Sequence, residues 1–388
     1  MAVPRHVDRQ APGRAPGPQP PGPGFSSYEP AEVTWLLTDL SGVHLEVGTT
    51  DREEAIQGGR HYSEMLPVEY EPGAAYTALF HRALATSADR LARAVGLAAE
   101  LILDRHRDGG APGPPVLVSL ARAGTPVGIL LRRWLAQVCG VDAPHATVSI
   151  VRGRGLDLVA LRWLLERHPA SALRFVDGWT GKGAIGRELT AAVATAGVGG
   201  LDPELAVLAD PGSCTSLFGT RDDFLVPSAC LNSTVSGLVS RTVLRDDLIG
   251  PRMFHGGKHY PELAPADVSA VFLDAVSARF GAVEPDVRRA LPAHRAAERT
   301  PTWAGWAAVE AIAAEHGIAD VNLVKPGVGE TTRVLLRRVP WRVLVRAGAP
   351  ERDLEHVRLL AAQRGVPVLE IPRLAYTCVG LIRPAGRA

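Results

Sequence analysis

The segment that most constrains this fold runs from Phe175 to Leu189 and reads FVDGWTGKGAIGREL. An apolar stretch ends at Asp177, a loop with three glycines follows, and the chain then takes up a helical pattern. A strand, a small-residue turn and a helix start form an anion site, because backbone N–H groups converge at the start of the helix and glycine lets a ligand approach them closely. An acid at the end of the strand is suited to hold sugar hydroxyls or a metal ion. This segment therefore predicts a site for a sugar phosphate.

Strand and helix patterns alternate on both sides of this segment. Short apolar or β-branched runs lie at 116–120, 147–151, 173–176 and 205–208, and helical spacing follows the first three of them. Alternation of this kind predicts an α/β fold with a doubly wound, mostly parallel sheet. Ligands bind such sheets at the carboxyl ends of the strands, so we expect the loops that follow these runs to share one edge.

The length of 388 residues allows about two domains and a tail. Residues 1–28 are rich in Pro and Gly and are predicted to form a disordered arm. The globular pattern of the first domain covers 29–280. A segment rich in Ala, Pro and Arg at 281–301 is expected to act as a linker, and 302–388 is predicted to form a smaller α/β domain.

The overall charge and the cysteine content limit which partners and which cellular compartment we expect for this protein. A formal net charge of +1 provides no general attraction to nucleic acid or to a membrane surface. The exception is the stretch from Asp320 onward, where twelve Lys and Arg stand against six Asp and Glu. Four scattered cysteines without a C-x-x-C pair indicate a reducing compartment and no zinc cluster. With no apolar segment of about 20 residues and no signal-peptide pattern, we expect a cytoplasmic protein without a membrane partner.

Two further loops carry arginines at positions suited to phosphate. The loop ARAGTP at 121–126 follows the first clear strand, and its Arg122 offers a planar fork of donors. A plain turn with a solvated arginine is the alternative. The loop VRGRGLD at 151–157 carries Arg152 and Arg154, and we expect it either to close over a diphosphate or to be an exposed basic loop.

A dense group of hydroxyl and amide side chains lies between residues 221 and 241. We interpret Asn232, Ser233 and Thr234 as part of a half-buried hydrogen-bonding wall that recognises a second substrate. The alternative is a segment of small residues that packs closely on the sheet.

The glycine-rich loop described first resembles the ribose-phosphate motif of the type I phosphoribosyltransferases. That motif has four apolar residues, two acids and a small loop rich in Thr and Gly. Here Leu173–Val176, Asp177 and Thr180–Ala184 match it, while Gly178 replaces the second acid. The resemblance implies a sheet of the phosphoribosyltransferase kind, with Asp177 and Arg122 as catalytic residues and Mg²⁺ bound by Asp177 and a diphosphate substrate. Together with the neighbouring loops, it implies these substrate-binding residues: Ala123, Gly124, Thr125, Arg152, Arg154, Gly178, Thr180, Gly181, Lys182, Gly183, Asn232, Ser233 and Thr234.

The longer text is similar to one particular group of proteins. SLARAGTPVG, SIVRGRGLD, FVDGWTGKGAI and RDDFLVPSACLNSTVSGLVSRTVL resemble the phosphoribosyltransferase-like StiP family of bacterial tellurite-resistance and stress clusters, across roughly residues 30–280. Proteins of this family are often labelled as cysteine proteases. The resemblance implies a glycosyltransferase of the phosphoribosyltransferase type. Its substrate would be a phosphoribosyl-diphosphate-like small molecule with Mg²⁺, in a nucleotide-like pathway of the stress or tellurite response.

Two other functions stay open beside this interpretation. The missing second acid at Gly178 favours a non-catalytic module that senses nucleotide or RNA. A cysteine protease is the other alternative. It requires a thiolate with a partner histidine, and neither Cys214 nor Cys230 shows the sequence signature of such a pair. We therefore interpret both cysteines as packing residues.

The last part of the chain resembles the Pelota-type RNA-binding domain. The matching text is KPGVGETTR at 325–333, followed by a strand at 343–345 and the region through Leu381. The resemblance implies that the glycine loop and the helix start contact the RNA backbone, and a helix N-terminus with basic side chains favours phosphate contacts. A structural α/β domain with a solvated basic face is the alternative. The RNA-contacting residues that the resemblance implies are Lys325, Gly327, Gly329, Glu330, Thr331 and Arg333.

Overall fold

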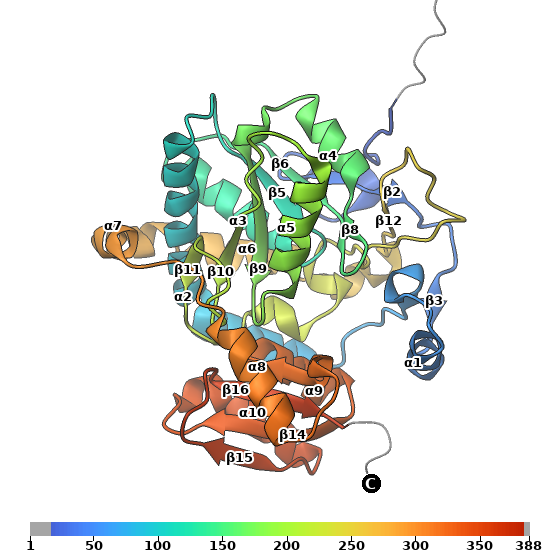
Figure 1. Cartoon of the computed structure of the whole chain (residues 1–388), viewed down its shortest axis with the longest axis vertical. Coiled ribbons are helices and arrows are strands. Elements are labelled where there is room, and N and C mark those ends of the chain that lie inside the picture. Colours follow the sequence, from blue (N-terminus) through green and yellow to red (C-terminus); the bar gives the residue numbers. More distant parts are fainter. Residues whose placement is uncertain (1–16, 384–388) are drawn as a thin grey trace, which may run out of the picture.

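The computed structural model describes residues 17–383 (Figure 1). The first domain is built on a six-stranded parallel sheet with the strand order β1-β6-β5-β9-β10-β11. These strands are β1 (Thr34–Leu36), β5 (Val116–Leu120), β6 (His145–Val148), β9 (Leu173–Trp179), β10 (Leu205–Ala209) and β11 (Phe218–Thr220). The prediction of an α/β fold with a mostly parallel sheet is therefore confirmed. Its assignment to the phosphoribosyltransferase kind stays a prediction.

Helices cover both faces of this sheet, because both faces are apolar. Leu117 and Val176 belong to one buried cluster, while their strand neighbours Val118 and Phe175 belong to the cluster on the other side. Near-continuous apolar strands of this kind are typical of parallel sheets buried on both faces. The first face packs against α2 (Ala74–Asp108) and α3 (Gly124–Gln137), and α6 (Ser269–Ser277) and α7 (Phe280–Ala296) pack on these helices. The second face packs against α4 (Leu158–Leu165) and α5 (Ala184–Ala196).

Several short elements lie outside the six-stranded sheet. The helix α1 (Thr49–Gln57) and three small two-stranded pairs are among them. The pairs join β2 (Thr38–Asp39) to β12 (Gly256–Gly257), β3 (Glu46–Val47) to β4 (Leu66–Pro67), and β7 (Ile150–Val151) to β8 (Gly155–Leu156). The pair β7–β8 packs on α5. Within residues 17–383, no helix is both long enough and apolar enough to cross a membrane.

The C-terminal domain has a mixed four-stranded sheet with the order β13-β16-β14-β15. Its elements are α8 (Ala304–Glu315), β13 (Val324–Pro326), α9 (Val328–Arg337), β14 (Pro340–Arg346), α10 (Glu351–Gln363), β15 (Val368–Ile371) and β16 (Cys378–Ile382). Figure 1 shows this domain, in orange to red, against one end of the parallel-sheet domain. Leu335 of α9 and Leu91 of α2 belong to one buried cluster, so an apolar core continues across the boundary.

Two segments, 281–301 and 1–28, differ in the structure from what the sequence predicts. Most of the segment predicted as a linker, 281–301, forms α7, whose apolar residues Val283, Val287 and Leu291 repeat every four positions and are buried. This spacing gives the helix one apolar face, which packs on α2. In the predicted disordered arm, residues 1–16 lie outside the described part. Phe25 and Tyr28 of that arm are buried near Trp35.

Candidate functional site

The two predicted phosphate loops lie side by side at the carboxyl edge of the sheet. β5 and β9 are neighbours, so the turns that follow them emerge together. At Gly124 a Cβ atom would lie 2.7 Å from the carbonyl oxygen of Val176 and 3.3 Å from the Cα of Asp177. Gly124 therefore permits a backbone approach that any side chain would prevent. The shared edge expected from the sequence is present.

Asp177 is half-buried, near the end of β9. Its Oδ1 accepts the backbone N–H of Gly178 at 2.7 Å. Burial raises the pKa of this carboxyl to about 6, although the hydrogen bond and the charge of Arg333 act in the opposite direction. Among the described residues, no group of three or more His, Cys, Asp or Glu is placed to hold a metal ion. Protein atoms thus offer Mg²⁺ little beyond Asp177 itself, and magnesium stays a prediction.

The turn at Thr180–Gly183 contacts the C-terminal domain. The Gly181 carbonyl accepts the hydroxyl of Tyr376 at 2.6 Å, and Lys182 Nζ donates to the carbonyl of Val321 at 3.0 Å. Gly183 takes a φ of 69° as the N-cap of α5, and no side chain caps this helix. Burial, followed by the charges of Lys325 and Arg152, lowers the pKa of Lys182 to about 8. This turn therefore belongs to a domain junction as well as to the sheet edge.

Arg122 is joined to the predicted polar wall through Glu69. Arg122 Nη1 lies 2.7 Å from Glu69 Oε1 and donates to the carbonyl of Val239 at 3.0 Å. Glu69 Oε2 accepts the backbone N–H of Ser233 at 3.1 Å and its hydroxyl at 3.2 Å. Asn232 caps the next turn by accepting the N–H of Thr234 at 3.3 Å. Sequence reasoning missed Glu69, because no local motif marks a carboxylate that pairs with an arginine 53 positions away.

The basic loop at 151–157 is tied down on several sides. Arg154 forms an ion pair with Glu64 and donates to the carbonyl of Leu244 at 3.0 Å. Arg152 Nη1 donates to Asn322 Oδ1 of the C-terminal domain at 3.2 Å. The Glu188 carboxylate of α5 accepts two backbone N–H groups of the loop, at 2.8 and 2.9 Å. In this conformation both arginines serve protein contacts.

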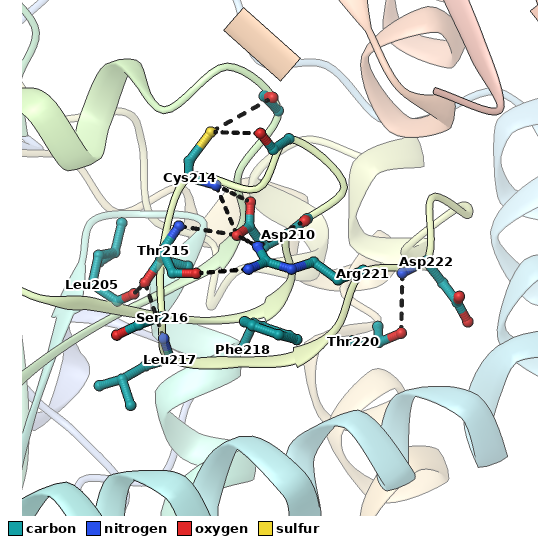
Figure 2. A network of polar contacts seen from close by, with 12 residues as sticks. Leu205, Asp210, Cys214, Thr215, Ser216, Leu217, Phe218, Thr220, Arg221 and Asp222 are labelled. Atoms are coloured by element: carbon teal, nitrogen blue, oxygen red, sulfur yellow. Dashed lines mark hydrogen bonds and ion pairs between the residues drawn. The ribbon is translucent and has the colours of Figure 1, made fainter. Parts of the chain in front are cut away.

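A polar network surrounds Cys214 at the end of β10 (Figure 2). The fully buried Asp210 carboxylate accepts the backbone N–H groups of Cys214 and Thr215, with its Oδ2 at 2.9 and 3.0 Å, and forms an ion pair with Arg221. Burial raises the pKa of Asp210 to about 6. The half-buried Cys214 Sγ lies 3.4 Å from the carbonyl oxygen of Gly212. Burial, followed by the charge of Asp210, raises the pKa of this thiol to about 12.

The other three cysteines offer poorer positions for a nucleophile. Cys230 and Cys378 are fully buried. Cys139 follows α3, and its Sγ lies 3.5 Å from Glu100, away from the carboxyl edge of the sheet. Burial, followed by the charge of Glu100, raises the pKa of Cys139 to about 12. Cys214 is thus the one half-exposed cysteine at the edge where ligands bind such sheets.

The predicted RNA-contacting loop faces the first domain. The N–H of Val328, at the start of α9, donates to Asp223 Oδ1 at 2.8 Å. A Cβ atom at Gly327 would lie 2.6 Å from Trp179, and Thr331 is fully buried. Lys325, Gly329, Glu330 and Arg333 are partly exposed. RNA contact by these residues stays a prediction, and access to Gly327 and Thr331 requires movement at the junction.

These features define a two-domain α/β protein with a cysteine at its sheet edge and a charged junction between the domains. A family model described as tellurite-like stress resistance cysteine protease StiP matches residues 26–277, and the PELOTA RNA binding domain matches residues 303–384. The chain belongs to the StiP family. The cysteine protease StiP of Acinetobacter baylyi is 34% identical over 379 residues, which cover 94% of this chain and 96% of that protein.

The predicted resemblance to the StiP family and to the Pelota domain is confirmed, its phosphoribosyltransferase-like part is not, and the enzyme class is corrected. The main prediction of a phosphoribosyltransferase-type glycosyltransferase is wrong, because both the family and the relative are named as cysteine proteases. The misleading signal was a strand, a glycine turn and a helix start, which many α/β folds share for anion binding. The absent second acid at Gly178 already departed from the transferase motif.

Proposed function

We propose that this chain is a thiol-dependent protease of the stress response and that Cys214 supplies the nucleophile. The position of Cys214 in the fold is the main support for this proposal. Cys214 is half-exposed at the carboxyl edge of the parallel sheet, beside the uncapped start of α5. The family description and the name of the relative support the hydrolase class.

The reaction asks for a thiolate that attacks a peptide carbonyl carbon. The C–N bond then breaks, the amine leaves with a proton, and water hydrolyses the thioester. In the conformation described here Cys214 is a protonated thiol at neutral pH, because burial and Asp210 raise its pKa. The recorded contacts of Cys214 within residues 17–383 include no histidine.

Two nearby groups provide a route to activation. The charges of Arg187 and Arg221 already act to lower the pKa of Cys214. Asp210 has a pKa of about 6, which suits a proton acceptor near neutral pH. We infer that substrate binding shifts the balance by moving Cys214 toward these arginines. Cys214 is then the catalytic nucleophile. Asp210, which also accepts the backbone N–H of Cys214, takes up the thiol proton and returns it to the leaving amine.

The deciding experiment is cleavage of a fluorescently labelled unfolded protein by the full chain. Cys214→Ser is expected to abolish cleavage, and iodoacetamide is expected to inhibit the unmodified protein. Cys139→Ser is the matched control, because Cys139 is also half-exposed and has a similarly raised pKa. Full activity in the Cys214→Ser variant would exclude this thiol as the nucleophile.

RNA is the second candidate partner, through the C-terminal domain. The match to the PELOTA RNA binding domain and the excess of twelve basic over six acidic residues from Asp320 onward favour it. Binding of a short fluorescent RNA, followed by anisotropy at increasing salt, tests this function. Affinity that falls steeply with salt is expected for phosphate contacts. No binding at low salt would remove RNA as a partner.

A further inference from the structure

The start of α8 is bound to the loop that carries Cys214. The backbone N–H of Trp303 donates to the carbonyl of Ser213 at 2.9 Å, and that of Gly305 donates to the carbonyl of Gly212 at 3.0 Å. The first N–H groups of a helix have no partner within the helix and need one from outside. Carbonyls of the loop supply it here, so the first turn of α8 is fixed directly beside Cys214.

The indole of Trp303 lies against the same glycine as the Cys214 thiol. A Cβ atom at Gly183 would lie 2.3 Å from Cζ3 of this indole and 3.0 Å from the Sγ of Cys214. Arg187 of α5 lies over the indole, with its guanidinium carbon 5.3 Å from a ring centroid. Trp303 therefore fills the space beside the thiol that Gly183, which has no side chain, leaves open.

Trp303 has a backbone conformation that the surrounding contacts must maintain. Its φ of 57° and ψ of 23° lie in the left-handed region, as the N-cap of α8. A bulky residue is strained there and stays only where its surroundings fix it. The connection at 297–302, which precedes Trp303, has no helix or strand and is mostly exposed. The start of α8 is thus joined to the first domain by a segment that no regular element stiffens.

The start of α8 belongs to the C-terminal domain as a packed unit. Val309 and Ile312 of α8 share a buried cluster with Val324 of β13. The same domain reaches the glycine turn beside the thiol, because the Tyr376 hydroxyl donates to the carbonyl of Gly181 at 2.6 Å. Any movement of the C-terminal domain away from the sheet edge therefore takes the Trp303 indole with it.

We propose that residues 303–305 form an autoinhibitory cover over Cys214 and that the C-terminal domain moves away from the sheet edge before a peptide reaches the thiol. A reacting carbonyl carbon must come within about 3–3.5 Å of the sulfur. The indole occupies the space beside the sulfur on the side of Gly183. The effect on cleavage rests on the proposed function of Cys214, whereas the restricted access to its thiol does not.

Alkylation of Cys214 by iodoacetamide in the full chain tests the cover. Trp303→Gly removes the indole and leaves an unstrained backbone, because glycine adopts a positive φ freely. This variant is expected to be alkylated at Cys214 about tenfold faster or more. Trp306→Ala is the matched control, because Trp306 contacts Arg187 at 4.2 Å one helical turn further along. Its rate is expected to stay within about twofold of that of the unmodified protein.

A second variant weakens the closed arrangement without removing a large side chain. Tyr376→Phe deletes the hydroxyl that donates to Gly181, and it is expected to speed alkylation of Cys214 by about two- to tenfold. The rate at Cys139 is expected to stay constant. Equal acceleration at Cys139 would indicate general loosening and would overturn the proposal, as would an unchanged rate at Cys214 in both Trp303→Gly and Tyr376→Phe.

Cleavage of a fluorescently labelled unfolded protein separates this proposal from the proposed function. Trp303→Gly is expected to cleave faster than the unmodified protein, in step with its faster alkylation. If the unmodified protein cleaves and Trp303→Gly cleaves no faster, the cover does not inhibit and the proposal fails. Faster alkylation of Cys214 with no cleavage by any form would support the cover and would instead contradict the role of this thiol in proteolysis.

Discussion

Asp223 of the first domain caps a helix of the second, because its Oδ1 accepts the backbone N–H of Val328 at 2.8 Å. Its Oδ2 accepts the N–H of Thr377 at 2.8 Å, so both oxygens serve the C-terminal domain. An acid at a helix N-terminus is favoured by the helix dipole. The start of α9, where an anion would otherwise bind, is thus occupied by a carboxylate of the same chain.

The pH dependence of stability tests the burial of Asp223. Burial raises its pKa from 3.8 to about 6, so the folded protein binds this proton more tightly than the unfolded chain does. The contribution of Asp223 to the free energy of unfolding therefore falls as pH rises from about 4 to about 6, by roughly 3 kcal/mol for about two pKa units. Asn at this position cannot titrate. The difference in unfolding free energy, Asp223→Asn minus unmodified, is expected to increase by about this amount over the range.

Urea unfolding at several pH values measures this difference. The absolute stability of Asp223→Asn is a poor readout, because its amide N–H group would face a backbone donor at one of the two contacts. The loss caused by the amide N–H group is the same at every pH. It therefore does not change how the difference in unfolding free energy between the two proteins varies with pH. A difference that stays flat between about pH 4 and pH 7 would show that Asp223 is not buried as a raised-pKa acid.

The reactivity of Cys214 depends on Asp210. Because the Asp210 charge raises the pKa of this thiol, Asp210→Asn is expected to lower the pKa and to speed alkylation by iodoacetamide several-fold at mildly alkaline pH. Mass spectrometry of the modified peptides measures the rate. Cys139 serves as the internal control, since its thiol responds chiefly to burial and Glu100. Slower alkylation of Cys214 in the variant would contradict the expected electrostatic effect.

The sequence predicted the elements that depend on local pattern. The strands expected at 116–120 and 205–208 match β5 and β10, because a short apolar run bounded by turns specifies a buried strand directly. The neighbouring positions of the two phosphate loops followed from the rule that parallel strands share one carboxyl edge. The segment 281–301, predicted as a linker from its Ala, Pro and Arg content, is mostly the helix α7. There the repeated apolar face decided the structure.

The long-range contacts around the candidate site could not be predicted from the sequence. Glu69 meets Arg122, and Asp223 meets Val328, only after the chain has folded. Such pairs depend on how loops and domains dock, which no spacing within one segment encodes. Lys182 was predicted in a phosphate loop, yet its Nζ donates to Val321 of the C-terminal domain. The sequence thus predicted that the two loops share an edge of the sheet, but not that the C-terminal domain lies against it.

The docking of the C-terminal domain depends on Gly327. This residue has a φ of 88°, and a Cβ atom would lie 2.6 Å from Trp179 and 3.0 Å from Asp223 Oδ1. Gly327→Ala is expected to destabilise the protein by about 2–4 kcal/mol through backbone strain and steric overlap. Gly348→Ala is the matched control, because Gly348 has a φ of 72° with open space around it. It is expected to lose about 1–2 kcal/mol from strain alone.

Urea unfolding and limited proteolysis distinguish the two alanine variants. Gly327→Ala is expected to expose new cleavage sites near the junction, since its clash lies between the domains. Equal stability of the two variants would mean that the contact with Trp179 is easily relieved.

Alanine is expected to have opposite effects on stability at two helical glycines of the first domain, Gly96 and Gly186. At Gly96 of α2, a Cβ atom would lie 2.6 Å from Trp134 of α3 and 2.9 Å from Val287 of α7, all of them in the core. Gly96→Ala is expected to cost about 1–3 kcal/mol, because a close-packed interior has no room for a methyl group. Gly186 of α5 has open space, and alanine there is expected to stabilise the protein by about 0.5–1 kcal/mol through helix propensity. Calorimetric melting of both variants shows whether each one lowers or raises the stability of the protein. A stabilising Gly96→Ala would show that α2, α3 and α7 do not meet as closely as the structure has them.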